Sequence, residues 1–129
     1  MSLRHLFVPL EIAKVLKEKG FNEECFYHWS TVPEGYTDEP RLLDNGGYGK
    51  KNKNDELNHL QISAPTYQQV QDWFREVYEL EVGVELKSHS NYYSIVYNFS
   101  DYKEGVKSEF TFSYYEALQV SINKAITII

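Results

Sequence analysis

Two helix-start signatures constrain the fold more than any other feature of this chain. Thr66 lies three positions before Gln69, and at a second place Ser113 lies three positions before a glutamate, Glu116. In such a capping box the hydroxyl accepts a hydrogen bond from a free backbone N–H, and the longer side chain reaches back to the cap residue. The sequence therefore predicts one helix that begins beside Thr66 and another that begins beside Ser113.

Apolar residues at helical spacing follow both signatures. Each set forms a stripe that must be covered by a sheet or by another helix. The first stripe consists of Tyr67, Val70, Trp73, Phe74 and Val77. The second consists of Tyr115, Leu118, Ile122, Ala125, Ile126 and Ile129. A further helix is predicted over residues 8–20, where Gly20 suits the left-handed stop and Phe21 would fold back onto the helix.

Strands are predicted from β-forming and alternating segments. The segments are 24–30, 57–63, a hairpin formed by 82–87 and 93–99, and 110–112. In the hairpin the odd positions Tyr93, Ile95, Tyr97 and Phe99 are expected to form the buried face. The polar segment 101–107 is predicted to be a loop, because it carries Gly105 and few apolar residues.

The order of these elements predicts an α+β fold. We expect a mainly antiparallel sheet of about four to five strands with three helices, two of them packed on one face. A chain of 129 residues suits a single domain over 1–129. Residues 31–56 are rich in Pro, Gly, Asp, Asn and Lys, so they are predicted to form a long loop.

Charge and composition exclude several classes of function. A net charge of −6 opposes a sequence-independent grip on nucleic acid and disfavours anionic membranes. No apolar stretch reaches the roughly 18 residues of a membrane span. One cysteine and no signal-like start predict a reducing, cytoplasmic compartment. Membranes and nucleic acid are therefore not the expected partners.

The glycine-rich segment 46–51 is similar to a phosphate-binding loop in composition only. The pattern would need Gly at position 44 and Ser or Thr at position 51, whereas the chain has Asp44 and Lys51. We therefore interpret the segment as a flexible loop. The lysines at its end and just beyond it, Lys50, Lys51 and Lys53, leave weak nucleic-acid binding as an alternative function.

Cys25 and His28 are the residues most typical of catalysis. On a strand, residues three apart point to opposite faces, so this pair cannot hold one metal ion without a bend. A small hydrolase or transferase that uses Cys25 with His28 or His59 remains an alternative. No catalytic, cofactor-binding or metal-binding residue is predicted.

Tyrosine gives the strongest functional indication, because the chain has 11 tyrosines. Tyr92, Val96 and Tyr102 are expected on the hairpin face opposite the buried one. Tyrosine is enriched at protein interfaces for its large area and polar tip, although such rings can also simply flank a core. The predicted site is therefore an interaction surface for a protein partner or a second copy of the chain.

Residues 62–76, which read ISAPTYQQVQDWFRE, and residues 113–118, which read SYYEAL, resemble a family of small proteins encoded in phages and prophages of gut anaerobes. The family has no established activity. The resemblance implies an origin on a mobile element and a cytoplasmic accessory role. Together with the surplus of tyrosine, it leads to the hypothesis of a non-enzymatic protein-interaction module.

Overall fold

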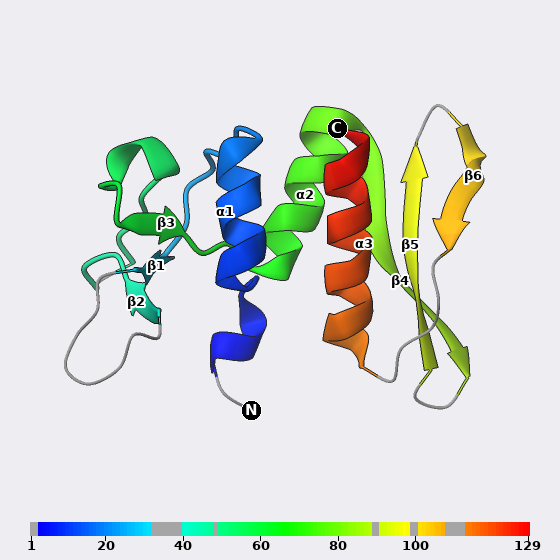
Figure 1. Ribbon diagram of the computed structural model, residues 1–129, viewed down its shortest axis with the longest axis horizontal. Coiled ribbons are helices and arrows are strands. Elements are labelled where there is room, and N and C mark those ends of the chain that lie inside the picture. Colours follow the sequence, from blue (N-terminus) through cyan, green and yellow to red (C-terminus); the bar gives the residue numbers. More distant parts are fainter. Residues whose placement is uncertain (1–2, 32–39, 48, 89–90, 99–100, 108–112) are drawn as a thin grey trace. The chain divides into compact units, whose positions relative to one another are not determined.

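The computed structural model of the protein divides into two compact units, an N-terminal unit (residues 1–66) and a C-terminal unit (residues 67–129) (Figure 1). It describes residues 3–31, 40–47, 49–88, 91–98, 101–107 and 113–129. These residues form three α-helices and two three-stranded antiparallel sheets, which confirms the α+β class. The strands predicted for one sheet are divided between two. That both units belong to a single domain over 1–129 stays a prediction.

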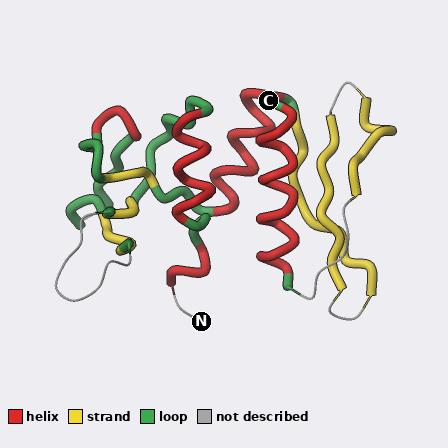
Figure 2. Tube along the Cα trace, in the orientation of Figure 1, coloured by secondary structure: helices red, strands yellow, loops and turns green. Residues whose placement is uncertain are grey.

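The N-terminal unit is built on a short antiparallel sheet of order β2-β1-β3 (Figure 2). Its elements are the 3-10 helix η1 (Leu3–Leu6), α1 (Leu10–Glu18), β1 (Tyr27–Ser30), β2 (Arg41–Asp44), the 3-10 helix η2 (Asn54–Glu56) and β3 (Gln61–Ser63). Helix α1 packs beside β3. Trp29 of the central strand is buried, and its indole Nε1–H donates to the Val8 carbonyl over 3.0 Å. This bond ties the sheet to the segment that leads into α1.

Helix α1 ends as the sequence predicts. Gly20 has a φ of +95°, in the left-handed region that glycine adopts at no steric cost. The Phe21 N–H donates to the Leu16 carbonyl over 2.9 Å, and the Gly20 N–H donates to the Lys17 carbonyl. These two bonds form a Schellman motif, in which buried Phe21 folds back onto buried Leu16.

The predicted long loop over residues 31–56 contains two regular elements, so that prediction is corrected. Strand β2 pairs with β1, with Leu43 opposite His28 and Leu42 opposite Trp29, and η2 lies further along the same segment. Residues 32–39 lie outside the described part of the chain. Strand β2 has only four residues and two apolar side chains, so its sequence shows no periodicity. It forms a strand because it pairs with β1.

The C-terminal unit is a three-stranded meander of order β4-β5-β6 with two helices. Its elements are α2 (Tyr67–Tyr78), β4 (Leu80–Ser88), β5 (Asn91–Asn98), β6 (Asp101–Lys107) and α3 (Tyr114–Ile128). Both helices pack against β4, α3 also packs against β5, and both lie on one side of the sheet (Figure 1). The expected packing of two helices on one face is therefore confirmed. Segment 101–107, predicted as a loop, is the edge strand β6, and segment 110–112 lies outside the described residues.

Both predicted helix starts lie where the sequence places them. The Ser113 hydroxyl accepts from the Glu116 N–H over 3.4 Å at the start of α3, and α2 begins directly after Thr66. Helix α2 ends at Tyr78, because Glu79 turns into the left-handed region with a φ of +55°. Val77 is 54% exposed, so it does not belong to the covered stripe predicted for this helix.

The two faces of strand β5 are the reverse of those predicted. Val82, Ser94 and Val96 are buried under the helices, and the Ser94 hydroxyl donates to the Ala117 carbonyl of α3 over 2.5 Å. Tyr93, Ile95 and Tyr97 are only half-buried and occupy the opposite face. Both faces of β5 carry large apolar side chains. The alternation of side chains along the strand therefore separates the two faces but does not show which of them the helices cover.

Candidate functional site

We call the sheet face turned away from α2 and α3 the outer face. Cross-strand pairs share a face, and three pairs define it: Glu81 with Tyr97, Gly83 with Ile95, and Glu85 with Tyr93. The outer face therefore has a row of Tyr, Ile and Tyr on β5 beside a row of Glu, Gly and Glu on β4. A Cβ added at Gly83 would meet no atom within 4 Å, so the β4 row has a gap opposite Ile95.

The three residues predicted as an interaction surface lie in different environments. Val96 is only 3% exposed and belongs to the core, which corrects its predicted place on a free face. The Tyr92 ring lies 5.9 Å from the Tyr114 ring at the start of α3, in an edge-to-face arrangement. Tyr102 lies in β6, whose side chains are outside the described part of the structure. Of the two residues whose side chains are described, Val96 thus lies in the core and Tyr92 packs beside the start of α3, and the place of Tyr102 on an interaction surface stays a prediction.

An ion-pair network fixes one border of the outer face. Arg75 of α2 grips Glu81 of β4 with two bonds of 2.8 Å, from Nε to Oε2 and from Nη2 to Oε1, and Arg75 Nη1 also reaches Asp72 over 3.0 Å. The hydrogen bonds from Arg75 lower the pKa of the Glu81 carboxyl. Beside this pair, the Gln71 amide donates to the Val82 carbonyl over 2.9 Å. Helix α2 is thereby attached to β4 through side chains as well as through its apolar stripe.

Glu81→Gln is expected to lower the free energy of unfolding by about 0.5–1 kcal/mol near neutral pH. The side chains of Arg75 and Glu81 are 40% and 38% exposed, so solvent screens the pair. Because the pKa of Glu81 is lowered in the folded state, its contribution is present above the unfolded pKa of about 4.3 and is lost as the pH falls through the folded value. Urea unfolding at several pH values measures this, with Glu76→Gln on the exposed face of α2 as the control. A stability difference between Glu81→Gln and wild type that does not shrink in acid would contradict the assignment.

A buried polar cluster lies in the N-terminal unit and is centred on Asn45. The Asn45 Nδ2 donates to the Cys25 carbonyl over 2.7 Å, so its Oδ1 is the acceptor that faces His28 Nδ1 at 2.5 Å. This assigns the His28 ring proton to Nδ1 and leaves Nε2 to accept from the Gln61 amide at 3.3 Å. Both ring nitrogens of His28 therefore have partners that hold the β2–β1–β3 sheet together.

Cys25 is a buried thiol that contacts neither of its two candidate bases, His28 and His59. Its Sγ is 3.6 Å from the Glu23 carbonyl, and burial raises the thiol pKa to about 12, which the nearby Ser63 hydroxyl only partly offsets. Neither nitrogen of His28 contacts this thiol, and His59 is exposed. The geometry therefore does not support a hydrolase or transferase that uses Cys25. Among the described residues, no three His, Cys, Asp or Glu side chains are grouped to hold a metal ion.

Cys25 is expected to react with iodoacetamide at least about 100-fold more slowly in the folded protein than in denaturing urea. The thiolate is the reactive form, and its pKa rises from 9.0 to about 12 on folding. The same shift means that stability falls as the pH rises above the unfolded value, because the unfolded state then binds fewer protons. Mass spectrometry of the alkylated protein at about pH 8 measures the rates. Similar rates in both states would restore Cys25 as a candidate nucleophile.

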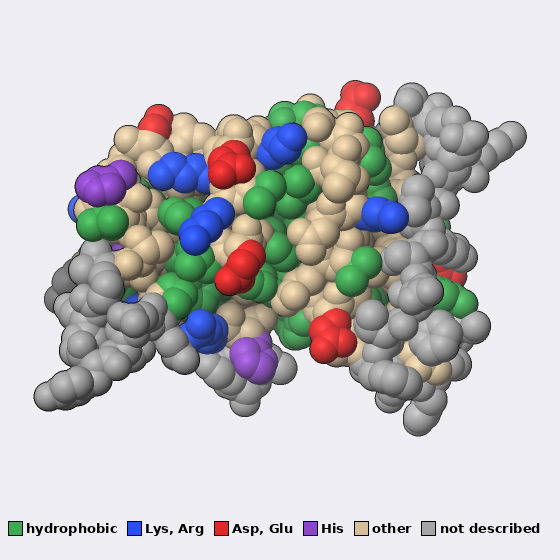
Figure 3. Space-filling view, viewed as in Figure 1, with side chains coloured by type: hydrophobic (Ala, Val, Ile, Leu, Met, Phe, Trp, Pro, Cys, Tyr) green, Lys and Arg blue, Asp and Glu red, His purple; other side chains and the backbone are tan. Residues whose placement is uncertain are grey.

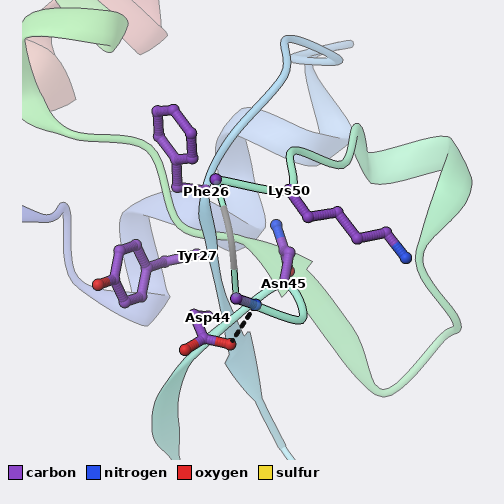
Figure 4. Close-up of a pocket in the computed structure, with 7 residues that line it drawn as sticks. Phe26, Tyr27, Asp44, Asn45 and Lys50 are labelled. Atoms are coloured by element: carbon purple, nitrogen blue, oxygen red, sulfur yellow. Dashed lines mark hydrogen bonds between the residues drawn. The ribbon is translucent and has the colours of Figure 1, made fainter.

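A surface pocket lies beside the glycine-rich turn that follows β2 (Figure 4). The Asp44 Oδ1 accepts from the N–H groups of Gly46 and Gly47 over 3.1 and 3.2 Å, which closes the turn. Those two N–H groups are thus used within the turn, unlike those of a phosphate-binding loop. The pocket measures about 380 Å³ and is lined by Phe26, Tyr27, Asp44, Asn45, Gly47, Gly49 and Lys50.

Comparisons with protein-family models, with curated proteins and with solved structures found no match. None of the helices in the described ranges is both long enough and apolar enough to cross a membrane. Within each unit, the face drawn in Figure 3 carries acidic and basic side chains interspersed rather than in blocks of one sign.

Proposed function

We propose that the protein is a non-enzymatic protein-interaction module and that the outer face of the β4-β5-β6 sheet is its binding surface. One observation carries the proposal: Tyr93, Ile95 and Tyr97 occupy the sheet face turned away from both helices of the unit. An antiparallel sheet covered by helices on one face ordinarily presents polar side chains on the other. In this protein the uncovered face carries two aromatic rings and an isoleucine.

The arrangement of side chains on the outer face suits a protein partner. Tyr93 and Tyr97 flank Ile95 on β5, and Glu81 and Glu85 border them on β4. Protein interfaces combine an apolar, aromatic centre with a polar rim, and tyrosine is enriched in them. The partner is either a second copy of the chain or another protein, and self-association is the case to test first.

The setting of this function is proposed from the sequence. The resemblance of residues 62–76 and 113–118 to phage and prophage proteins supports an origin on a mobile element and a cytoplasmic accessory role. The buried, protonated thiol of Cys25 weighs against the enzymatic alternative. No cofactor is required for a module that acts by binding.

The test is light scattering coupled to size-exclusion chromatography, at two concentrations and two salt levels. We expect a dimer that persists at high salt, because apolar contacts are not screened. Ile95→Lys should return the protein to a monomer, whereas the control Val77→Lys, at an exposed apolar position of α2, should not.

A photo-crosslinking residue placed at position 95 distinguishes self-association from another partner by the mass of the adduct formed in cells. The same residue at position 77 is the control. A monomer under all conditions, together with no more crosslinking at 95 than at 77, would contradict the proposed function.

A further inference from the structure

Two glycines, Gly47 and Gly49, line the pocket beside the glycine-rich turn. Gly47 and Gly49 have φ values of +73° and +72°, and neither places a side chain in the pocket. A Cβ added at Gly49 would lie 3.9 Å from Cε1 of Phe26, so a larger side chain there would extend beside the ring. The volume of about 380 Å³ falls at the lower end of the range for small-molecule sites.

An exposed aromatic ring forms one side of the pocket. Phe26 is 45% exposed although it directly precedes β1, in which three of the four residues are buried. The Lys51 ammonium lies 5.0 Å from the centre of the Phe26 ring, a cation–π contact that orients the ring in solvent. Exposed rings of this kind are used to stack the bases of nucleotides.

Positive charge lies beside the ring. Lys50 lines the pocket and Lys51 covers part of Phe26. None of the ion pairs between described residues involves either lysine. Asp44, the acidic residue of the wall, already uses Oδ1 to accept two backbone N–H groups. The pocket therefore offers an aromatic ring and one lysine in its wall, and the ammonium group of Lys51 lies over that ring although Lys51 does not line the pocket.

We propose that this pocket binds a nucleoside phosphate, with the base stacked on Phe26 and the phosphate held by Lys50 and Lys51. The site is independent of the outer face. Because Gly46 and Gly47 donate to Asp44, phosphate is bound by lysine charge and not by a nest of backbone N–H groups. The ring is then needed to anchor the ligand, which excludes bare phosphate as the natural occupant. A free nucleotide and a nucleotide of a single strand share this chemistry, and the net charge of −6 favours the free nucleotide.

The experiment is a titration of ¹⁵N-labelled full-length protein followed by NMR, with four probes: ATP, adenosine, inorganic phosphate and a six-nucleotide oligothymidine. We expect ATP to shift the amide signals of Gly47, Gly49 and Lys50 with a Kd of about 1 mM or tighter. Adenosine or inorganic phosphate alone should bind at least about tenfold more weakly, because each supplies half of the contacts. If oligothymidine shifts the same amide signals and ATP does not, the pocket binds a nucleotide of single-stranded nucleic acid.

Substitutions separate the two parts of the site. Phe26→Ala and the double variant Lys50→Ala, Lys51→Ala should each weaken ATP binding at least about tenfold, whereas the control Lys124→Ala on α3 should not. Phe26 and both lysines are exposed, so these variants are expected to fold. An amide spectrum that matches the wild-type spectrum away from the substituted residues shows that a variant is folded. Shifts as strong with inorganic phosphate as with ATP, ATP binding retained in Phe26→Ala, or no shifts with ATP and oligothymidine would each overturn the proposal.

Discussion

Val96→Lys is expected to unfold the C-terminal unit, whereas Ile95→Lys, one position earlier on the same strand, is expected to leave it folded. Val96 is 3% exposed and lies under the helices, so a lysine there would bury an unpaired charge at a cost of about 4 kcal/mol or more. Ile95 lies on the outer face, where a lysine can extend into solvent. Its substitution should cost about 1 kcal/mol or less.

Fluorine NMR on protein labelled with 5-fluorotryptophan measures the state of each unit separately. The chain has two tryptophans, and Trp29 lies in the N-terminal unit while Trp73 lies in the C-terminal unit. Val96→Lys should move the Trp73 resonance to its unfolded position, and Ile95→Lys should not. The milder substitutions Val96→Ala and Ile95→Ala can be compared by urea unfolding. Val96→Ala should lower the free energy of unfolding by about 2 kcal/mol, and Ile95→Ala should lower it by less. Equal losses in each pair would contradict the assignment of the two faces.

Helix boundaries in this chain were predictable because their chemistry is local. The bond from the Glu116 N–H to the Ser113 hydroxyl lies within four consecutive residues, and the Schellman motif at Gly20 and Phe21 lies within six. Both are specified by residue types at fixed spacing and need no knowledge of the rest of the fold. The same locality explains why the predicted starts of α2 and α3 agree with the structure.

Strand faces and short strands were not predictable in this way. The sequence of β5 places Tyr92, Ser94 and Val96 on one face and Tyr93, Ile95 and Tyr97 on the other, and both sets contain large apolar residues. Which set is buried depends on where α2 and α3 pack, and that is a tertiary property. The polar sequences of β2 and β6 likewise form strands because a neighbouring strand supplies the hydrogen-bonding partner.

The candidate sites were partly visible in the sequence. The alternation that distinguishes Tyr93, Ile95 and Tyr97 was recognised, although it was assigned to the core. The partners of His28 were missed, because Asn45 and Gln61 are 17 and 33 residues away and asparagine in a glycine-rich segment is typical of a turn. The bidentate contact of Arg75 with Glu81 was also missed, since it depends on the left-handed turn at Glu79, a position where glycine is usual.

Asn54→Ala is expected to lower the free energy of unfolding of the N-terminal unit by about 2–4 kcal/mol. The Asn54 Nδ2 donates to the Phe21 carbonyl over 2.8 Å, and its Oδ1 accepts from the Ser63 N–H over 2.9 Å. Asn54 is 6% exposed, so water cannot replace either bond. Each backbone group left unpaired costs about 1–3 kcal/mol, and the two groups lie at the end of α1 and in β3. One side chain therefore joins the helix terminus to the sheet edge.

Asn22→Ala is the matched control for Asn54→Ala. Asn22 also makes two side-chain hydrogen bonds over 33 residues, from Nδ2 to Asp55 Oδ2 and from the Asp55 N–H to Oδ1, both of 3.0 Å. These bonds are exposed, so water replaces them and their loss should cost about 0.5–1 kcal/mol. Urea unfolding followed through the Trp29 fluorine resonance compares the two variants. If Asn54→Ala costs no more than Asn22→Ala, the prediction is wrong. Either water then reaches Asn54, or the Phe21 and Ser63 backbone groups find other partners.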